Sequence, residues 1–126
     1  MVSFQATHIH LYSTDLDHAV EFYKGMFGAK VVRERTTVSG RTVFLDVNGL
    51  QLLISGGATT LMPASPEETH YGVDHFGFSA ENLDEAVADL KGKGAKFYKE
   101  LTTSPRGIRY AFIDAPDNVR IELTQR

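Results

Sequence analysis

The chain has 126 residues, of which 42% are hydrophobic and 23% charged, with a formal net charge of −3. This length suffices for one domain with its own core. The absence of cysteine excludes disulfides, thiolate metal ligands and a cysteine nucleophile. The charges are interspersed and form no basic surface for nucleic acid or anionic lipid. No stretch resembles a membrane span or a signal peptide, so by elimination we expect a cytoplasmic protein.

The first half of the chain predicts a strand, a helix and three more strands. Residues 7–12 alternate in polarity as a strand does. Asp15 is an N-cap candidate for a helix over residues 16–27, and Gly28 is its C-cap candidate. Strands follow over residues 30–36, 41–47 and 50–55. Asn48-Gly49 joins the last two and is a strong hairpin signal.

The second half repeats this order. We expect a strand over residues 74–79, a helix over about 83–93, and strands over 96–101, 109–114 and 119–125. A shift of 67 positions (75 minus 8) lays His8 on His75 and Leu16-Asp17 on Leu83-Asp84. The chain therefore contains an internal duplication.

These elements predict a single α+β domain over residues 1–126, made of two paired βαβββ modules that form a concave sheet around a metal site, with the helices outside. Module 1 is expected over about residues 1–56 and module 2 over about 73–126. Residues 57–72 are the expected linker. Its composition leaves open whether it is slack or closes over a site and brings His70 into it.

Strand alternation collects the polar candidates on one face. Residues two apart point the same way, so the apolar positions 43, 45, 47, 50, 52 and 54 should lie under the helices. The opposite face then carries the candidate metal-binding, catalytic and substrate-binding side chains: His8, His10, Tyr12, Phe44, Gln51, His75, Tyr110, Phe112, Arg120 and Glu122.

Two of these histidines, His8 and His75, begin the two modules at equivalent positions. If the modules pair about a pseudo-twofold axis, the two imidazoles come together on the same face as Glu122. Such a donor set suits one divalent ion of Fe, Ni, Co, Mn or Zn, and two histidines with one carboxylate is the arrangement of non-haem Fe(II) oxygenases. The alternative is that the histidines are duplicated sheet residues with ordinary hydrogen bonds and that Glu122 is solvated.

The paired modules, the histidine that begins each one, and the closing Ile121-Glu122-Leu123 resemble the vicinal oxygen chelate superfamily. That superfamily includes glyoxalase I, methylmalonyl-CoA epimerase, extradiol dioxygenases, and bleomycin and fosfomycin resistance proteins. The resemblance covers essentially the whole chain and implies that His8, His75 and Glu122 are metal ligands. Because Leu50-Gln51-Leu52 matches Ile121-Glu122-Leu123, Gln51 is the weaker fourth candidate. The resemblance also implies a homodimer.

The resemblance implies glyoxalase-like chemistry, in which a metal assists proton transfer on an oxygen-chelating carbonyl substrate in a lyase, isomerase or epimerase reaction. Glu122 is the candidate for moving the proton, and His10 is a weaker one. A non-haem Fe(II) or Mn(II) dioxygenase remains the first alternative, although Phe112 stands where the extradiol signature has tyrosine. A metal-free protein that binds an antibiotic or another small molecule is the second alternative.

Substrate binding is expected on the same face. Tyr12, Phe44, Tyr110 and Phe112 are candidates for an aromatic-lined pocket, and Arg120 is a candidate anchor for an anionic substrate. We therefore expect the partner to be a small molecule, and neither nucleic acid nor a membrane.

Overall fold

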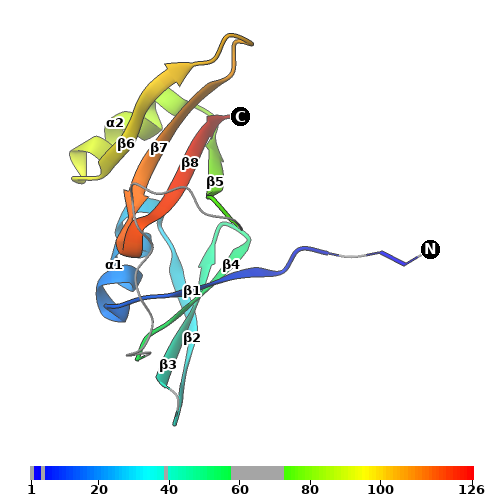
Figure 1. Ribbon diagram of the computed structural model, residues 1–126, viewed down its shortest axis with the longest axis vertical. Coiled ribbons are helices and arrows are strands. Elements are labelled where there is room, and N and C mark those ends of the chain that lie inside the picture. The colour runs from blue at the N-terminus through cyan, green and yellow to red at the C-terminus, as the bar shows by residue number, and fades with distance from the viewer. Residues whose placement is uncertain (1, 4, 39, 58–72) are drawn as a thin grey trace. The chain divides into compact units, whose positions relative to one another are not determined.

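The computed structural model describes residues 2–3, 5–38, 40–57 and 73–126 (Figure 1). The chain divides into unit 1, Met1–Met62, and unit 2, Pro63–Arg126. Each unit follows the order strand, helix, strand, strand, strand, which confirms the two βαβββ modules and the α+β class. Residues 58–72, with His70 and the expected closure of the linker, lie outside the described residues. Neither described helix has the length and apolarity to cross a membrane.

Unit 1 contains β1 (His8–Tyr12), α1 (Leu16–Phe27), β2 (Lys30–Thr37), β3 (Gly40–Val47) and β4 (Leu50–Ser55). The strand order is β1-β4-β3-β2, with β1 parallel to β4 and the other pairs antiparallel. Both predicted caps of α1 are confirmed, because the Asp15 side chain accepts a hydrogen bond from the His18 N–H and Gly28 adopts a φ of 69°. Asn48 and Gly49 both have positive φ in the β3–β4 turn, as their hairpin signal requires.

Unit 2 contains β5 (Phe76–Ala80), α2 (Leu83–Gly92), β6 (Lys96–Thr103), β7 (Arg109–Ala115), the short 3₁₀ turn η1 (Pro116–Asn118) and β8 (Val119–Gln125). Its order, β5-β8-β7-β6, repeats that of unit 1. The first strand of unit 2 begins two residues later than predicted, because its pairing with β8 starts at Phe76 opposite Ile121. Asp74 and His75 therefore precede the strand and do not take part in its ladder.

Each unit buries one face of its sheet under its own helix. The contacts run from α1 to β3 and β4, and from α2 to β5, β6 and β8. We call the opposite face of each sheet the helix-distal face. The predicted alternation is largely confirmed, although Leu50 and Val119 are only half-buried. The buried apolar side chains on the strands under the helices are Val43, Leu45, Val47, Leu52 and Ile54 in unit 1, and Ala111, Ile113, Ala115, Ile121 and Leu123 in unit 2.

The edge strands of the two units, β2 and β6, carry a β-bulge at the same register position, so the two units can be aligned residue by residue. In unit 1, Val31 pairs with Leu45 and Arg33 with Phe44, with a bulge between them. In unit 2, Phe97 pairs with Ile113 and Lys99 with Phe112, with a bulge at the same place. The repeat therefore equates Arg33 with Lys99, Phe44 with Phe112 and the bulged Val32 with Tyr98.

The same register corrects the match between β4 and β8. Phe44 pairs with Leu53, whereas its counterpart Phe112 pairs with Glu122. On the other side of these strands, His10 pairs with Leu53 and Gly77 with Glu122. Leu53 is thus the counterpart of Glu122, and the match of Leu50-Gln51-Leu52 to Ile121-Glu122-Leu123 is shifted by two residues.

Gln51 corresponds instead to Arg120, because Gln51 pairs with Asp46 and Arg120 pairs with Asp114. The sequence alone does not distinguish the two alignments, because residues 51 and 53 share a face of β4 and each stands between two apolar residues. Hydrogen-bonded pairing across two neighbouring strands is needed to separate the two alignments.

Candidate functional site

In unit 2, His75 and Glu122 lie side by side on the helix-distal face. The His75 Nε2 atom is 3.8 Å from Glu122 Oε1, and each side chain is about one-third exposed. This separation is close to the roughly 3.4 Å expected between two ligands held about 2.1 Å from one tetrahedral ion. The pair therefore has the donor types and the spacing of two ligands that share a metal ion.

Asp74 fixes the orientation of the His75 ring. Asp74 Oδ2 lies 2.8 Å from His75 Nδ1, within hydrogen-bond distance. If Nδ1 carries the proton and donates it to the carboxylate, the lone pair of a neutral imidazole is on Nε2, the atom that faces Glu122. Ligating histidines commonly have such a carboxylate on their other nitrogen. Asp74 was not predicted as a site residue, although its position next to His75 is a usable signal.

Arg120 extends this arrangement. Its Nη1 atom lies 3.9 Å from Asp74 Oδ1, and its side chain is only 15% exposed. Its guanidinium carbon is 4.0 Å from the centroid of the Tyr98 ring. Arg120 was predicted to anchor a substrate, and in the structure its guanidinium contacts Tyr98 and the carboxylate that holds His75. The ring of Phe112 meets His75 edge to face at 5.0 Å, and Tyr110 meets Phe112 at 5.9 Å.

In unit 1, His8 is the repeat counterpart of His75. Its Nδ1 lies 2.8 Å from the hydroxyl of Thr7, so a proton on Nδ1 would leave the Nε2 lone pair available. Gln51 is the register partner of His8 on the neighbouring strand. Unit 1 thus contributes one imidazole and a neighbouring amide, and the counterpart position of Glu122 holds the apolar Leu53.

His10 lies one alternation beyond His8 and belongs to a hydroxyl network. Its Nε2 atom is 2.7 Å from Ser55 Oγ, which is 2.6 Å from Thr42 Oγ1. The His10 ring stacks on Tyr12 with centroids 5.0 Å apart. Ser55, the buried member, was not identified from sequence. These contacts hold His10 in a defined orientation on the helix-distal face.

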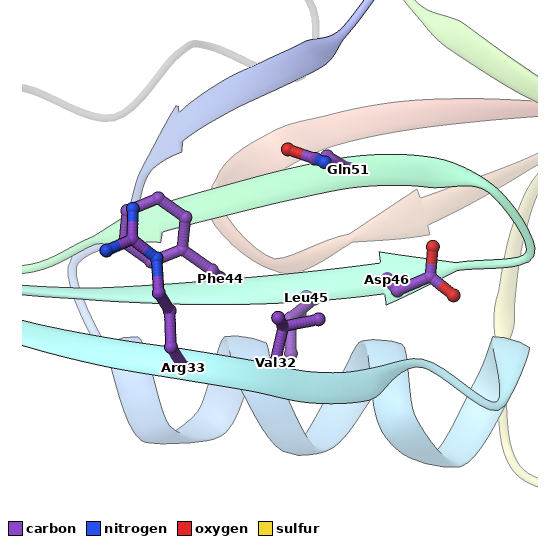
Figure 2. A pocket seen from close by; sticks show the side chains of 6 residues that line it. All are labelled: Val32, Arg33, Phe44, Leu45, Asp46 and Gln51. Atoms are coloured by element: carbon purple, nitrogen blue, oxygen red, sulfur yellow. The ribbon is translucent and has the colours of Figure 1, made fainter.

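A cavity of about 400 Å³ opens beside Gln51 in unit 1 (Figure 2). Of the predicted substrate-binding residues it includes Phe44. Figure 2 shows Gln51, Phe44 and the guanidinium of Arg33 on the side of the strands away from α1. Six residues line it: Val32, Arg33, Phe44, Leu45, Asp46 and Gln51.

The metal-ligand candidates are divided equally between the units, with His8 and Gln51 in unit 1 and His75 and Glu122 in unit 2. Among the described residues, no group of three or more histidine, aspartate or glutamate side chains is gathered as a metal cluster. Each pair fits a metal in donor type.

Known proteins share the two βαβββ units of this chain. The sequence model of the Glyoxalase/Bleomycin resistance protein/Dioxygenase superfamily matches residues 5–123. The chain belongs to this superfamily. Two similar superfamily structures share the fold. One is a glyoxalase family protein from Enterococcus faecalis, with a TM-score of 0.84, 22% identity, and coverage of 96% of this chain and 97% of that one. The other is glyoxalase I from Zea mays, with a TM-score of 0.81, 23% identity, and coverage of 97% and 44%.

Sequence relatives in this superfamily are distant. The lactoylglutathione lyase of Arabidopsis thaliana is 28% identical over 115 residues, which cover 89% of this chain and 41% of the lyase. The protein YwbC of Bacillus subtilis is 25% identical over 126 residues, which cover 94% of this chain and 95% of YwbC. The chain therefore spans about two-fifths of the plant enzyme and nearly all of the bacterial relative.

Proposed function

We propose that this superfamily member is a divalent-metal-dependent enzyme that moves a proton on a small carbonyl substrate, in a lyase, isomerase or epimerase reaction. The observation that carries the proposal is the His75–Glu122 pair, with Asp74 on the far nitrogen of His75. Membership of a superfamily whose members usually bind a divalent metal supports it, as does the similarity to a lactoylglutathione lyase.

We assign His8, His75 and Glu122 as the metal ligands, with Gln51 as the weaker candidate because the register gives the counterpart position to Leu53. A metal bound by these residues would polarise a substrate carbonyl and stabilise negative charge as a Lewis acid. The proposed ion is one of Fe, Ni, Co, Mn and Zn, and elemental analysis identifies which. We propose a cytoplasmic homodimer as the working form.

The protein groups then have distinct tasks. Asp74 holds the His75 ring so that Nε2 is available. We propose Glu122 as the carboxylate that accepts or returns a substrate proton, with His10, whose ring contacts Ser55, as the second candidate. We propose that the aromatic side chains Tyr12, Phe44, Tyr110 and Phe112 contact the substrate.

Dioxygenase activity is the second candidate, and one observation favours it. With Leu53 opposite Phe44, the proposed ligands would be two histidines and one carboxylate, a set that would leave positions on the ion for substrate and oxygen. This is the donor set that non-haem Fe(II) oxygenases use. Iron in the purified protein would move this candidate ahead of the lyase.

The first test is elemental analysis of protein purified without chelator or metal-affinity tag. We expect near-stoichiometric divalent metal in the wild type and its loss in His8→Ala and in Glu122→Ala. His18→Ala is the matched control, because His18 is exposed on α1. A wild-type protein that contains no metal and refuses added metal would overturn the proposal, and the small-molecule binding protein would then be the better hypothesis.

The second test addresses the reaction. The metal-loaded protein is incubated with S-lactoylglutathione in D₂O, and proton NMR follows the hydrogen on the carbon next to the thioester carbonyl. Removal of that proton by a protein base and return of a deuteron from solvent would show the proposed proton transfer. The exchange should disappear in Glu122→Gln, and elemental analysis of the same sample separates loss of the proton-transfer carboxylate from loss of the metal. A metal-loaded protein without exchange would exclude this substrate.

A further inference from the structure

The cavity of unit 1 lies at two positions where its side chains differ from those of unit 2. Val32 and Gln51 line it, and their counterparts in unit 2 are Tyr98 and Arg120. In unit 2 the guanidinium of Arg120 stacks on Tyr98 at 4.0 Å. The shorter valine and glutamine of unit 1 cannot form this stack, and their replacement explains the space beside Phe44. A volume of about 400 Å³ lies within the range of small-molecule sites.

Arg33 supplies a cation at this cavity. Its guanidinium carbon is 4.0 Å from the centroid of the Phe44 ring, and Figure 2 shows the side chain reaching over that ring. Stacking uses the flat face of a guanidinium and leaves its N–H donors pointing outward in the plane. Arg35 lies 5.6 Å from the same ring and adds a second positive charge. Within the described parts of the chain neither arginine forms an ion pair, and Glu34 between them is bound by Arg41.

The cavity also has a polar end that contains acceptors. Asp46 accepts a hydrogen bond from the Gly49 N–H through Oδ1, and its second oxygen remains a further acceptor. Gln51 lies on β4 opposite Asp46 and is also the register partner of His8. A ligand with an anionic end at Arg33 would therefore extend beside Phe44 toward Gln51 and β1, the strand that carries the proposed metal ligand His8.

We propose that this cavity binds the oxyanion, carboxylate or phosphate, of a small molecule whose remainder lies beside Phe44, toward Gln51. Arg33 forms charge-assisted hydrogen bonds with the anion, and Arg35 adds attraction. The inference rests on the proposed function only in treating this molecule as the substrate. Anion binding itself requires no metal, so the two proposals fail separately.

The test uses metal-free full-length protein and three probes of similar size: benzoate, phenyl phosphate and the neutral benzyl alcohol. Binding is followed by NMR through the side-chain amide of Gln51 and the Nε–H of Arg33. We expect at least one anion to bind more tightly than benzyl alcohol, and Arg33→Gln to weaken that anion about tenfold or more. The tighter anion identifies the oxyanion. Lys24→Gln is the charge-matched control, because Lys24 lies on α1, which packs against the other face of the sheet.

A second variant tests the origin of the cavity. The double variant Val32→Tyr/Gln51→Arg introduces the pair that unit 2 carries at the equivalent positions, Tyr98 at the bulge of β6 and Arg120 on β8. We expect it to fill the cavity and abolish anion binding, with thermal unfolding as the check on folding. Equal weakening by Lys24→Gln and Arg33→Gln, or equal binding of benzyl alcohol, would overturn the inference. So would unchanged anion binding in a folded double variant.

Discussion

At the scale of single residues, Asp74 lies between His75 and Arg120. It contacts His75 through Nδ1 and takes no part in the 3.8 Å approach of His75 to Glu122. Because hydrogen bonds to the far nitrogen of a ligand set its tautomer and basicity, we expect Asp74→Asn to lower metal affinity about 10–100-fold. Isothermal titration with Zn²⁺ measures this. Asp89→Asn on α2 removes the same charge from a pair with Lys93 and should leave the affinity unchanged.

Gln51 tests the corrected register. Since Leu53 is the counterpart of Glu122, we expect Gln51→Ala to retain the metal content of the wild type, whereas Glu122→Ala loses it. Elemental analysis of the two variants after identical purification decides the question. Loss of metal in Gln51→Ala would show that the amide beside His8 is a ligand after all.

At the scale of elements, Gly77 allows β5 to lie close to the ligand strand. A β-carbon added at Gly77 would lie 2.9 Å from the backbone oxygen of Glu122 and 3.4 Å from its Cβ. We expect Gly77→Ala to displace Glu122 and to destabilise unit 2 by about 1–3 kcal/mol, with a matching loss of metal affinity. Urea unfolding and metal titration measure the two effects. Gly25→Ala on α1, where an added Cβ meets nothing within 4 Å, is the control.

The ion pair between Asp84 and Arg109 fastens α2 to β7. Two hydrogen bonds of 2.8 and 2.9 Å join the side chains, and the hydrogen bond from Arg109 lowers the pKa of the Asp84 carboxyl below its ordinary value. A lowered pKa in the folded state contributes stability at neutral pH that disappears as the pH falls through that pKa. Unit 1 has the equivalent pair, Asp17 with Arg41, at 3.3 Å.

We therefore expect Asp84→Asn to lower the urea midpoint at pH 7, and this difference from the wild type to shrink below about pH 4. Unfolding curves at a series of pH values between 7 and 3 measure it. Glu85→Gln, a neighbouring carboxylate of the same helical turn, is the control for charge at the helix N-terminus. A difference that does not change with pH would mean that Asp84 acts through packing and not through its charge.

The elements show which parts of the structure the sequence could predict. Caps, hairpin turn and alternation depend on local rules, so α1, the β3–β4 hairpin and the buried faces followed from residues such as Asp15, Gly28 and Asn48. Which residues face one another across two strands depends on register, which alternation fixes only to within two residues. The Gln51 and Leu53 positions could not be separated for that reason. Contacts between distant residues, such as His10 with Ser55, had no local signal.

At the scale of the whole molecule, the proposed ligands come from both units, with His8 in unit 1 and His75 and Glu122 in unit 2. We expect an ion that needs both to be lost when either unit unfolds. A metal at 100 times its dissociation constant then adds about 2.7 kcal/mol to stability, which should raise the melting temperature by several degrees in the wild type. His8→Ala and Glu122→Ala should each abolish the rise.

Calorimetry with and without added metal measures these shifts. A rise retained in His8→Ala would mean that unit 2 binds the ion alone. Mixing His8→Ala with Glu122→Ala then distinguishes two assemblies of the proposed homodimer. Recovery of metal binding in the mixture would show that one site draws ligands from two copies, and no recovery would show that a single chain supplies them.

The duplication also has a consequence for symmetry. An assembly of two identical modules must present every side chain twice, so any change that creates a ligand or a cavity in one module appears in the other. Joining the copies in one chain removed that constraint. Leu53 stands at the counterpart position of Glu122, and Val32 and Gln51 stand where unit 2 has the Tyr98–Arg120 stack. The two units therefore keep one strand order while each carries its own set of side chains, so one backbone plan offers two different surfaces within a single chain.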